Sequence, residues 1–132
     1  MKKIALLLAI TLSACATEMQ DEVRGYGGFA EGYIAYQDGD YETALREWRP
    51  LADQGHATAQ FNLGLMYEKG LGVAKDYKQA ANWYRRSAEQ GDAHAQFSLG
   101  FMYFKGQGVP QDYSEAAKWY HKAAERGDTD AQ

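Results

Sequence analysis

Residues 61–96 read FNLGLMYEKGLGVAKDYKQAANWYRRSAEQGDAHAQ, and residues 97–132 read FSLGFMYFKGQGVPQDYSEAAKWYHKAAERGDTDAQ. The two segments align without a gap at a period of 36 residues, and they share all their glycines, their tryptophan and their tyrosines. A fixed period of this length is typical of a protein built from stacked copies of one small unit. The sequence therefore predicts a repeat protein.

A shorter and more divergent copy precedes them at residues 29–60. From Asp40 onward, its positions match those that lie 36 residues later. Upstream of Asp40 the offset falls to 32, so that Phe29 matches Phe61. The difference between the two offsets means that the first copy has a shorter loop inside its unit.

Each unit is expected to fold as two antiparallel helices, which makes the chain all-α. The second helix of each unit carries mostly small and aromatic side chains at i, i+3, i+4, i+7, i+10 and i+11, the spacing of one packing face. These residues are Tyr77, Ala80, Ala81, Tyr84, Ser87 and Ala88 in the second copy, and Tyr113, Ala116, Ala117, Tyr120, Ala123 and Ala124 in the third. Residues that favour helix starts and helix ends stand at the boundaries: Asp76, Asp92, Asp112 and Asp128, and Gly91 and Gly127.

Residues 29–132 resemble Sel-1-like repeats, a relative of tetratricopeptide repeats with a longer loop. The resemblance rests on the patterns Phe-x-Leu-Gly-x-Met-Tyr, Gly-x-Gly-Val and Asp-Tyr-x-x-Ala-Ala-x-Trp-Tyr in the last two copies. It implies a right-handed α-solenoid of about three repeats, with units at 29–60, 61–96 and 97–132. It also implies a scaffold that binds other proteins.

The first fourteen residues are expected to be a cleaved signal peptide. A basic start precedes an apolar run at residues 4–12, which is much shorter than the roughly 20 residues of a membrane-spanning helix. Residues 12–15, LSAC, resemble the lipobox of bacterial lipoproteins, in which the cysteine receives a diacylglycerol. The resemblance implies lipid attachment at Cys15. The alternative is an ordinary secretory peptide with an incidental cysteine.

Residues 15–28 are polar and rich in glycine, and we expect them to form a lipidated flexible tether. Ala16 follows the cysteine, and in lipoproteins a residue other than aspartate there implies transfer to the outer membrane. The expected location is therefore the bacterial cell envelope. The lipid at Cys15 would anchor the repeats to the outer membrane, facing the periplasm.

The composition of the chain narrows the function further. Its net charge of −4 argues against nucleic-acid binding, which depends on a clustered excess of lysine and arginine. A single cysteine excludes an internal disulfide and cysteine-rich zinc sites. The sequence has no Gly-x-Ser-x-Gly, His-Glu-x-x-His, Ser-x-x-Lys or Gly-x-x-x-x-Gly-Lys motif. We therefore expect no enzymatic activity, no catalytic or metal site and no cofactor.

The clearest binding signal is an apolar stripe on the first helix of each unit. In tetratricopeptide-like solenoids this face lines a concave groove, where rigid aromatic side chains anchor a peptide or a partner helix. The expected groove residues are Phe29, Tyr33, Tyr36, Phe61, Leu65, Glu68, Phe97, Phe101 and Phe104, with Lys69 and Lys105 at its lip. The alternative for Phe61 and Phe97 is packing of one first helix against the next. Phe104 is the best candidate for a binding residue, because its counterpart in the second copy is the charged Glu68.

The last helix pair carries a second signal. Trp119, Tyr120, Ala123 and Ala124 are expected to be partly uncovered, and a partner or a second copy of the chain would cover them. The alternatives are tolerated fraying of the last helices or a shortened gene. The expected function is a non-enzymatic scaffold or adaptor that binds an envelope protein. One alternative is a self-assembling structural module. The other is a cell-wall hydrolase similar to the β-lactamase-like relatives of the family, although those relatives are rich in paired cysteines.

Overall fold

The computed structural model describes residues 28–130, with the side chains of residues 28–127. All regular structure in this part of the chain is helical. The helices cover residues 28–37, α2 (Tyr41–Asp53), α3 (Ala57–Lys69), α4 (Tyr77–Glu89), α5 (Ala93–Lys105) and α6 (Tyr113–Asp130). The expected signal peptide at residues 1–14, the lipid site at Cys15 and all but the last residue of the tether lie outside the described residues.

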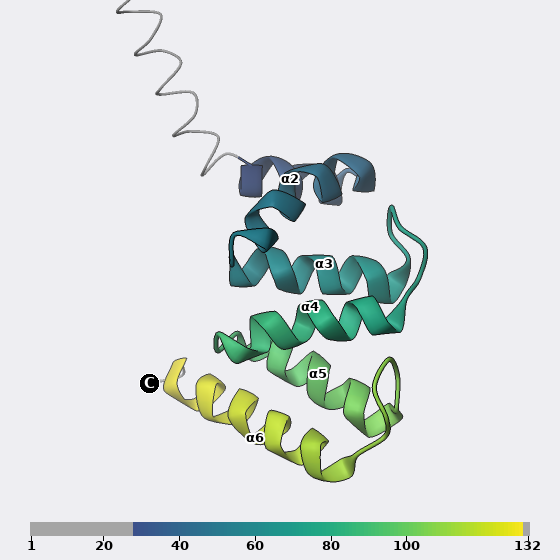
Figure 1. Ribbon diagram of the computed structural model, residues 1–132. Helices are drawn as coiled ribbons and strands as arrows, with labels where there is room; N and C mark the ends of the chain where they lie inside the picture. The colour runs from purple at the N-terminus through teal and green to yellow at the C-terminus, as the bar shows by residue number, and fades with distance from the viewer. Residues whose placement is uncertain (1–27, 131–132) are drawn as a thin grey trace, which may run out of the picture.

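The helices stack as antiparallel pairs. α3 packs on α4 and α5 packs on α6, and each of these pairs contacts the preceding one through α2 and α3 or through α4 and α5. Figure 1 shows the pairs following one another in a single row, with the long loops that join α3 to α4 and α5 to α6 on the same side. The prediction of an all-α solenoid of about three helix pairs is confirmed. Within residues 28–130, no helix has the length and apolar character needed to cross a membrane.

Three helix starts are stabilised by the caps that the sequence predicts. The carboxylates of Asp76, Asp92 and Asp112 each accept a hydrogen bond from the backbone N–H three residues later, at 2.9 to 3.2 Å. Such a bond satisfies one of the N–H groups that have no partner within the helix. His56 does the same for α3, because its Nδ1 accepts from the N–H of Ala59 at 3.1 Å. The sequence did not indicate this histidine cap.

The end of α6 differs from the prediction. α4 stops at Glu89, and Gly91 then takes a positive φ of 98° as the chain turns into α5. α6 instead continues through Gly127 to Asp130. The predicted helix end at Gly127 and the predicted cap at Asp128 are therefore wrong. Within the described residues no helix follows α6, and a continued helix satisfies the backbone hydrogen bonds without a turn.

Replacing Gly127 with alanine is expected to raise the free energy of unfolding by up to about 1 kcal/mol, because glycine is the poorer helix former. A Cβ added there meets no atom within 4 Å. Gly91→Ala is the matched control at the same repeat position. It should be destabilising, because φ is positive and the new Cβ would lie 2.8 Å from the guanidinium carbon of Arg126. Thermal unfolding followed by circular dichroism compares the two, and a destabilised Gly127→Ala variant would indicate a turn instead of a helix.

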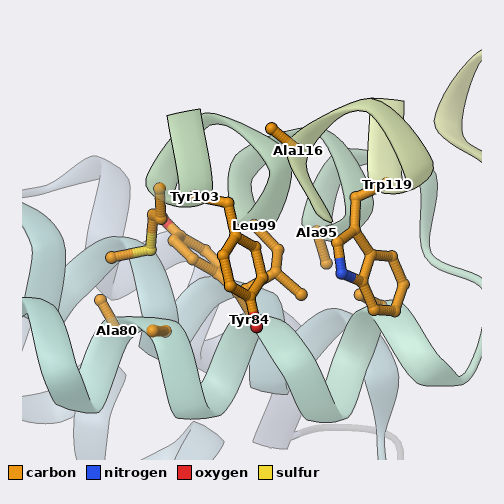
Figure 2. Close-up of a cluster of buried hydrophobic side chains, with 10 residues drawn as sticks. Ala80, Tyr84, Ala95, Leu99, Tyr103, Ala116 and Trp119 are labelled. Carbon is orange, nitrogen blue, oxygen red and sulfur yellow. The ribbon is translucent and has the colours of Figure 1, made fainter. Parts of the chain in front are cut away.

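Two hydrophobic clusters hold successive repeats together. Each joins the first helix of one repeat to the second helix of the repeat before it. The earlier cluster buries Ala44, Trp48, Ala52, Ala59, Leu63 and Met66. The later cluster buries the matching residues Ala80, Tyr84, Ala88, Ala95, Leu99 and Met102 (Figure 2). Trp119 of α6 belongs to this later cluster and is only 8% exposed, so the prediction that it is partly uncovered is wrong.

A hydrogen bond between long side chains crosses each boundary between repeats at the same position. A guanidinium nitrogen of Arg49 on α2 donates to the hydroxyl of Tyr67 on α3 at 2.6 Å. Arg85 on α4 donates to the hydroxyl of Tyr103 on α5 in the same way. These bonds link the second helix of one repeat to the first helix of the next, in addition to the buried clusters.

Candidate functional site

The C-terminal half of α5 carries an exposed aromatic surface. Phe101 and Phe104 are 38% and 45% exposed and lie on one side of the helix. The ammonium group of Lys105 is 5.8 Å from the ring centroid of Phe101 and 5.9 Å from that of Phe104, within the range of a cation–π contact. Tyr113, at the start of α6, is 62% exposed, and its ring centroid is 5.5 Å from that of Phe104. We call Phe101, Phe104, Lys105 and Tyr113 the aromatic patch.

The loop between α5 and α6 positions this patch. Gly106 ends α5 in the left-handed conformation, with φ of 67°. The side-chain amide of Gln111 then donates to the backbone carbonyl of Phe104 at 3.1 Å and to the hydroxyl of Tyr113 at 3.0 Å. One side chain therefore ties the end of α5 to the first residue of α6 and keeps the two rings beside each other.

Tyr113 was predicted to lie on the packing face of its helix, and the structure contradicts this prediction. Its counterparts Tyr41 and Tyr77 are half-buried, because the glycine loop of the next repeat lies against them. Within the described residues no such loop follows α6. Exposure of Tyr113 is thus a property of its place in the stack, and the periodicity of the sequence could not reveal it.

The expected groove residues of the second repeat are less open. Phe61 is half-buried between two rings, with centroids 5.6 Å from Tyr84 and 5.9 Å from His94 on α5. Leu65 is half-buried and packs against the later cluster. Lys69 is exposed at the end of α3. The middle of the expected groove is therefore partly filled by contacts between repeats.

Glu68 is engaged with the core instead of open solvent. Its carboxylate accepts a hydrogen bond of 2.5 Å from the hydroxyl of Tyr84, which is fully buried. Burial and this negatively charged acceptor together raise the pKa of Tyr84 well above its usual value. The tyrosine therefore stays protonated as the donor. Phe104 replaces Glu68 in the third repeat and makes no such bond, since a phenyl ring has no acceptor.

The expected groove residues of the first repeat also separate into two groups. Phe29 stacks on His56 at 5.1 Å, and Tyr36 packs edge-on against Tyr41 at 5.5 Å. Tyr33 stays 50% exposed. Phe29 and Tyr36 thus serve packing within the repeat, and Tyr33 remains available for contact.

Phe97 is the most exposed of the expected phenylalanines, at 58%. Its ring packs against Tyr120 of α6, with the two ring centroids 5.2 Å apart, and it lies one helical turn before Phe101 on α5. The structure therefore places Phe101, Phe104 and Lys105 together, and it places Phe97 at the end of the stack. Among the described residues, no group of three or more histidine, cysteine or carboxylate side chains could hold a metal ion.

Comparison with known proteins agrees with this architecture. Protein sel-1 homolog 2 of Mus musculus is 58% identical over 38 residues, which are 28% of this chain and 6% of the mouse protein. A Sel1 repeat protein from Oxalobacter formigenes superimposes with a TM-score of 0.69 at 44% identity, over 72% of this chain and 39% of that one. The protective antigen c5321 of uropathogenic Escherichia coli, which has an SLR fold, gives 0.73 at 39% identity, over 78% of this chain and 23% of that one.

The chain thus spans well under two thirds of each of these relatives. The family model described as Sel1 repeat matches residues 57–92 and 93–128, together more than half of the chain. Each match starts with α3 or α5, four residues before the corresponding unit predicted from the sequence. The chain therefore belongs to the Sel1 repeat family.

Proposed function

We propose that this protein is a non-enzymatic scaffold that binds a segment of another protein through the aromatic patch. The observation that carries this proposal is the exposure of Phe101, Phe104 and Tyr113 on one continuous surface. Large apolar side chains that gather at a surface are typical of sites that another protein covers, and rigid aromatic rings dominate the binding energy of such sites. Tyr33, on the corresponding face of the first repeat, extends the surface available to a long partner.

The chemistry of the patch favours an extended peptide or a helix with an apolar side chain next to a carboxylate. The apolar side chain would lie on the rings of Phe101 and Phe104. The ammonium of Lys105, which faces both rings, would pair with an aspartate, a glutamate or a C-terminal carboxylate. The same ammonium would disfavour a basic partner.

The partner, in this proposal, is a protein of the bacterial cell envelope. What supports this location is the apolar run at residues 4–12 and the lipobox-like segment that ends at Cys15. A diacylglycerol on Cys15 would hold the repeats at the outer membrane on its periplasmic side. A partner in the periplasm or at the inner surface of that membrane would then be within reach.

Photo-crosslinking in intact cells tests the proposal. A photoreactive phenylalanine analogue at position 104 should form an adduct with one foreign envelope protein, which mass spectrometry identifies. The matched control carries the same analogue at Asn82, an exposed position on α4, and should not form this adduct. Adducts only between copies of this chain would favour a self-assembling module, and no adduct at position 104 would contradict the proposal.

Phe104→Glu then measures the contribution of the ring. This substitution introduces the residue that the second repeat already has, so folding should be unaffected within about 0.5 kcal/mol. Affinity for the crosslinked partner should fall by about 30-fold or more, which corresponds to the ~2 kcal/mol of a hot-spot residue. Titration calorimetry with the purified partner gives the affinity. An unchanged affinity would remove Phe104 from the binding site.

A further inference from the structure

The end of the stack beyond the last helix pair carries a separate apolar hollow. It has a volume of about 540 Å³ and is lined by Ala93, His94, Phe97, Tyr120, Ala123 and Ala124. We call these six residues the end face. Phe97 is 58% exposed, Ala124 is exposed and Tyr120 is half-buried. No other part of residues 28–130 covers this surface.

The same surface of the middle repeat is covered by α5. There Tyr84 and Ala88, the counterparts of Tyr120 and Ala124, are only 0% and 2% exposed. Both belong to the later buried cluster, to which α5 contributes. Within residues 28–130, the end face is therefore the surface that a covering helix occupies in the middle repeat, with no helix on it. The repetition of the chain shows what kind of helix this surface accepts.

The two interfaces between repeats, α2 with α3 and α4 with α5, bury the same pattern of side chains on the covering helix. The covering helix buries an alanine, a leucine and a methionine at i, i+4 and i+7. These are Ala59, Leu63 and Met66 on α3, and Ala95, Leu99 and Met102 on α5. All six side chains are 0% exposed. The alanine permits a close approach of the two helices, and the leucine and methionine fill the space between them.

A second copy of this chain would present the helix over residues 28–37 to the end face. In that helix, Glu31 and Ile34 hold the positions of Leu63 and Met66. Glu31 is exposed and Ile34 is 59% exposed. Burial of the Glu31 carboxylate against an apolar surface is strongly unfavourable without a charged partner. Glu31 thus disfavours the head-to-tail growth that such a contact would otherwise allow.

We propose that the end face binds a helix of another protein that carries alanine, leucine and methionine at i, i+4 and i+7. The proposal also assigns a role to Glu31, which prevents a second copy of this chain from occupying the same surface. This surface shares no residue with the aromatic patch, although Phe97 lies one helical turn before Phe101 on α5. The bound helix would be a second interaction, beyond the scaffold function proposed above.

The test gives the first helix of this chain the leucine that it lacks. Glu31→Leu is made in the full chain, with Cys15→Ser in every variant to remove the thiol and its lipid. Light scattering then measures the molar mass over a wide concentration range. The parent chain should keep the mass of one molecule. The molar mass of the Glu31→Leu variant should rise with concentration and should not level off at a defined oligomer, because a head-to-tail contact does not close.

Two controls show where the association occurs. Addition of Ala124→Arg places a charge in the end face and should return the Glu31→Leu variant to the mass of one molecule. Glu42→Leu adds the same leucine at an exposed position of α2 and should leave the mass unchanged. The proposal would be refuted if the molar mass of the Glu42→Leu variant rose equally with concentration, or if that of the Glu31→Leu variant did not rise. Association of the parent chain that Ala124→Arg abolishes would identify a second copy as the occupant and overturn the role of Glu31.

Discussion

Replacing Trp48 with alanine is expected to lower the free energy of unfolding by about 3–5 kcal/mol. The side chain is 1% exposed, and its indole N–H donates to the carbonyl oxygen of Phe29 at 3.1 Å. It packs directly on Gly32, where an added Cβ would lie 2.7 Å from the indole Cδ1. Glycine has no side chain that could fill the space left by the indole. The cavity should therefore persist, and the helix over residues 28–37 should lose its main contact.

Trp83→Ala is the control for this prediction. Trp83 is half-buried, and the guanidinium of Arg86 lies over its ring at 4.7 Å, so water reaches part of the space that the ring occupies. Removal of the Trp83 ring should therefore lower the free energy of unfolding by clearly less than removal of the Trp48 ring. Guanidinium unfolding followed by far-ultraviolet circular dichroism measures both variants without depending on tryptophan emission. Equal losses for Trp48→Ala and Trp83→Ala would contradict the special role of Trp48 in holding the first repeat.

Gly108→Ala is expected to be the most damaging glycine substitution in the loops. Its φ of +71° costs an alanine about 1–2 kcal/mol. A Cβ there would also overlap the carbonyl group of Tyr77 and lie 2.9 Å from the backbone nitrogen of Lys78. Backbone atoms cannot rotate away as a side chain does, so the crowding should add about 1–3 kcal/mol. The loop between α5 and α6 would have to lift from the start of α4.

Gly39→Ala separates the two contributions to this cost. Gly39 has a similar φ of +82°, but a Cβ there meets no atom within 4 Å. This variant should therefore lose only the conformational part, about 1–2 kcal/mol. Chemical unfolding gives both values, and limited proteolysis should cut the loop around residue 108 faster in the Gly108→Ala variant. Indistinguishable unfolding curves would show that the loop does not rest on α4.

The helix pairs could be predicted because their causes are local in the sequence. The 36-residue period and the small side chains of the second helices predict paired helices, and Asp76, Asp92 and Asp112 cap the helices that follow them. The end of α6 could not be predicted in this way. Gly91 and Gly127 are preceded and followed by similar residues, but only Gly91 has a packed helix after it within the described residues.

Some residues of the candidate binding surface could likewise be predicted from the sequence, and others could not. Its key member, Phe104, was evident from the comparison with Glu68 at the matching position. Tyr113 was missed, because the same residue is half-buried in the two earlier repeats. The histidine cap at His56 was missed although it is local in the sequence, because histidine is not among the residues that usually cap the start of a helix. The arginine–tyrosine bonds were missed because they join helices of different repeats.

Phe61 and Phe97 show what the sequence decides and what the tertiary structure decides. The sequence alone determined that both lie on the same face of a first helix, because helical periodicity fixes the direction in which a residue points. Only the tertiary structure decided that α5 partly covers Phe61 and that Phe97 is left 58% exposed. The physical reason is that the burial of a side chain depends on the element packed against its face. In a stack of near-identical repeats, that neighbour differs between the middle and the end even where the sequence does not.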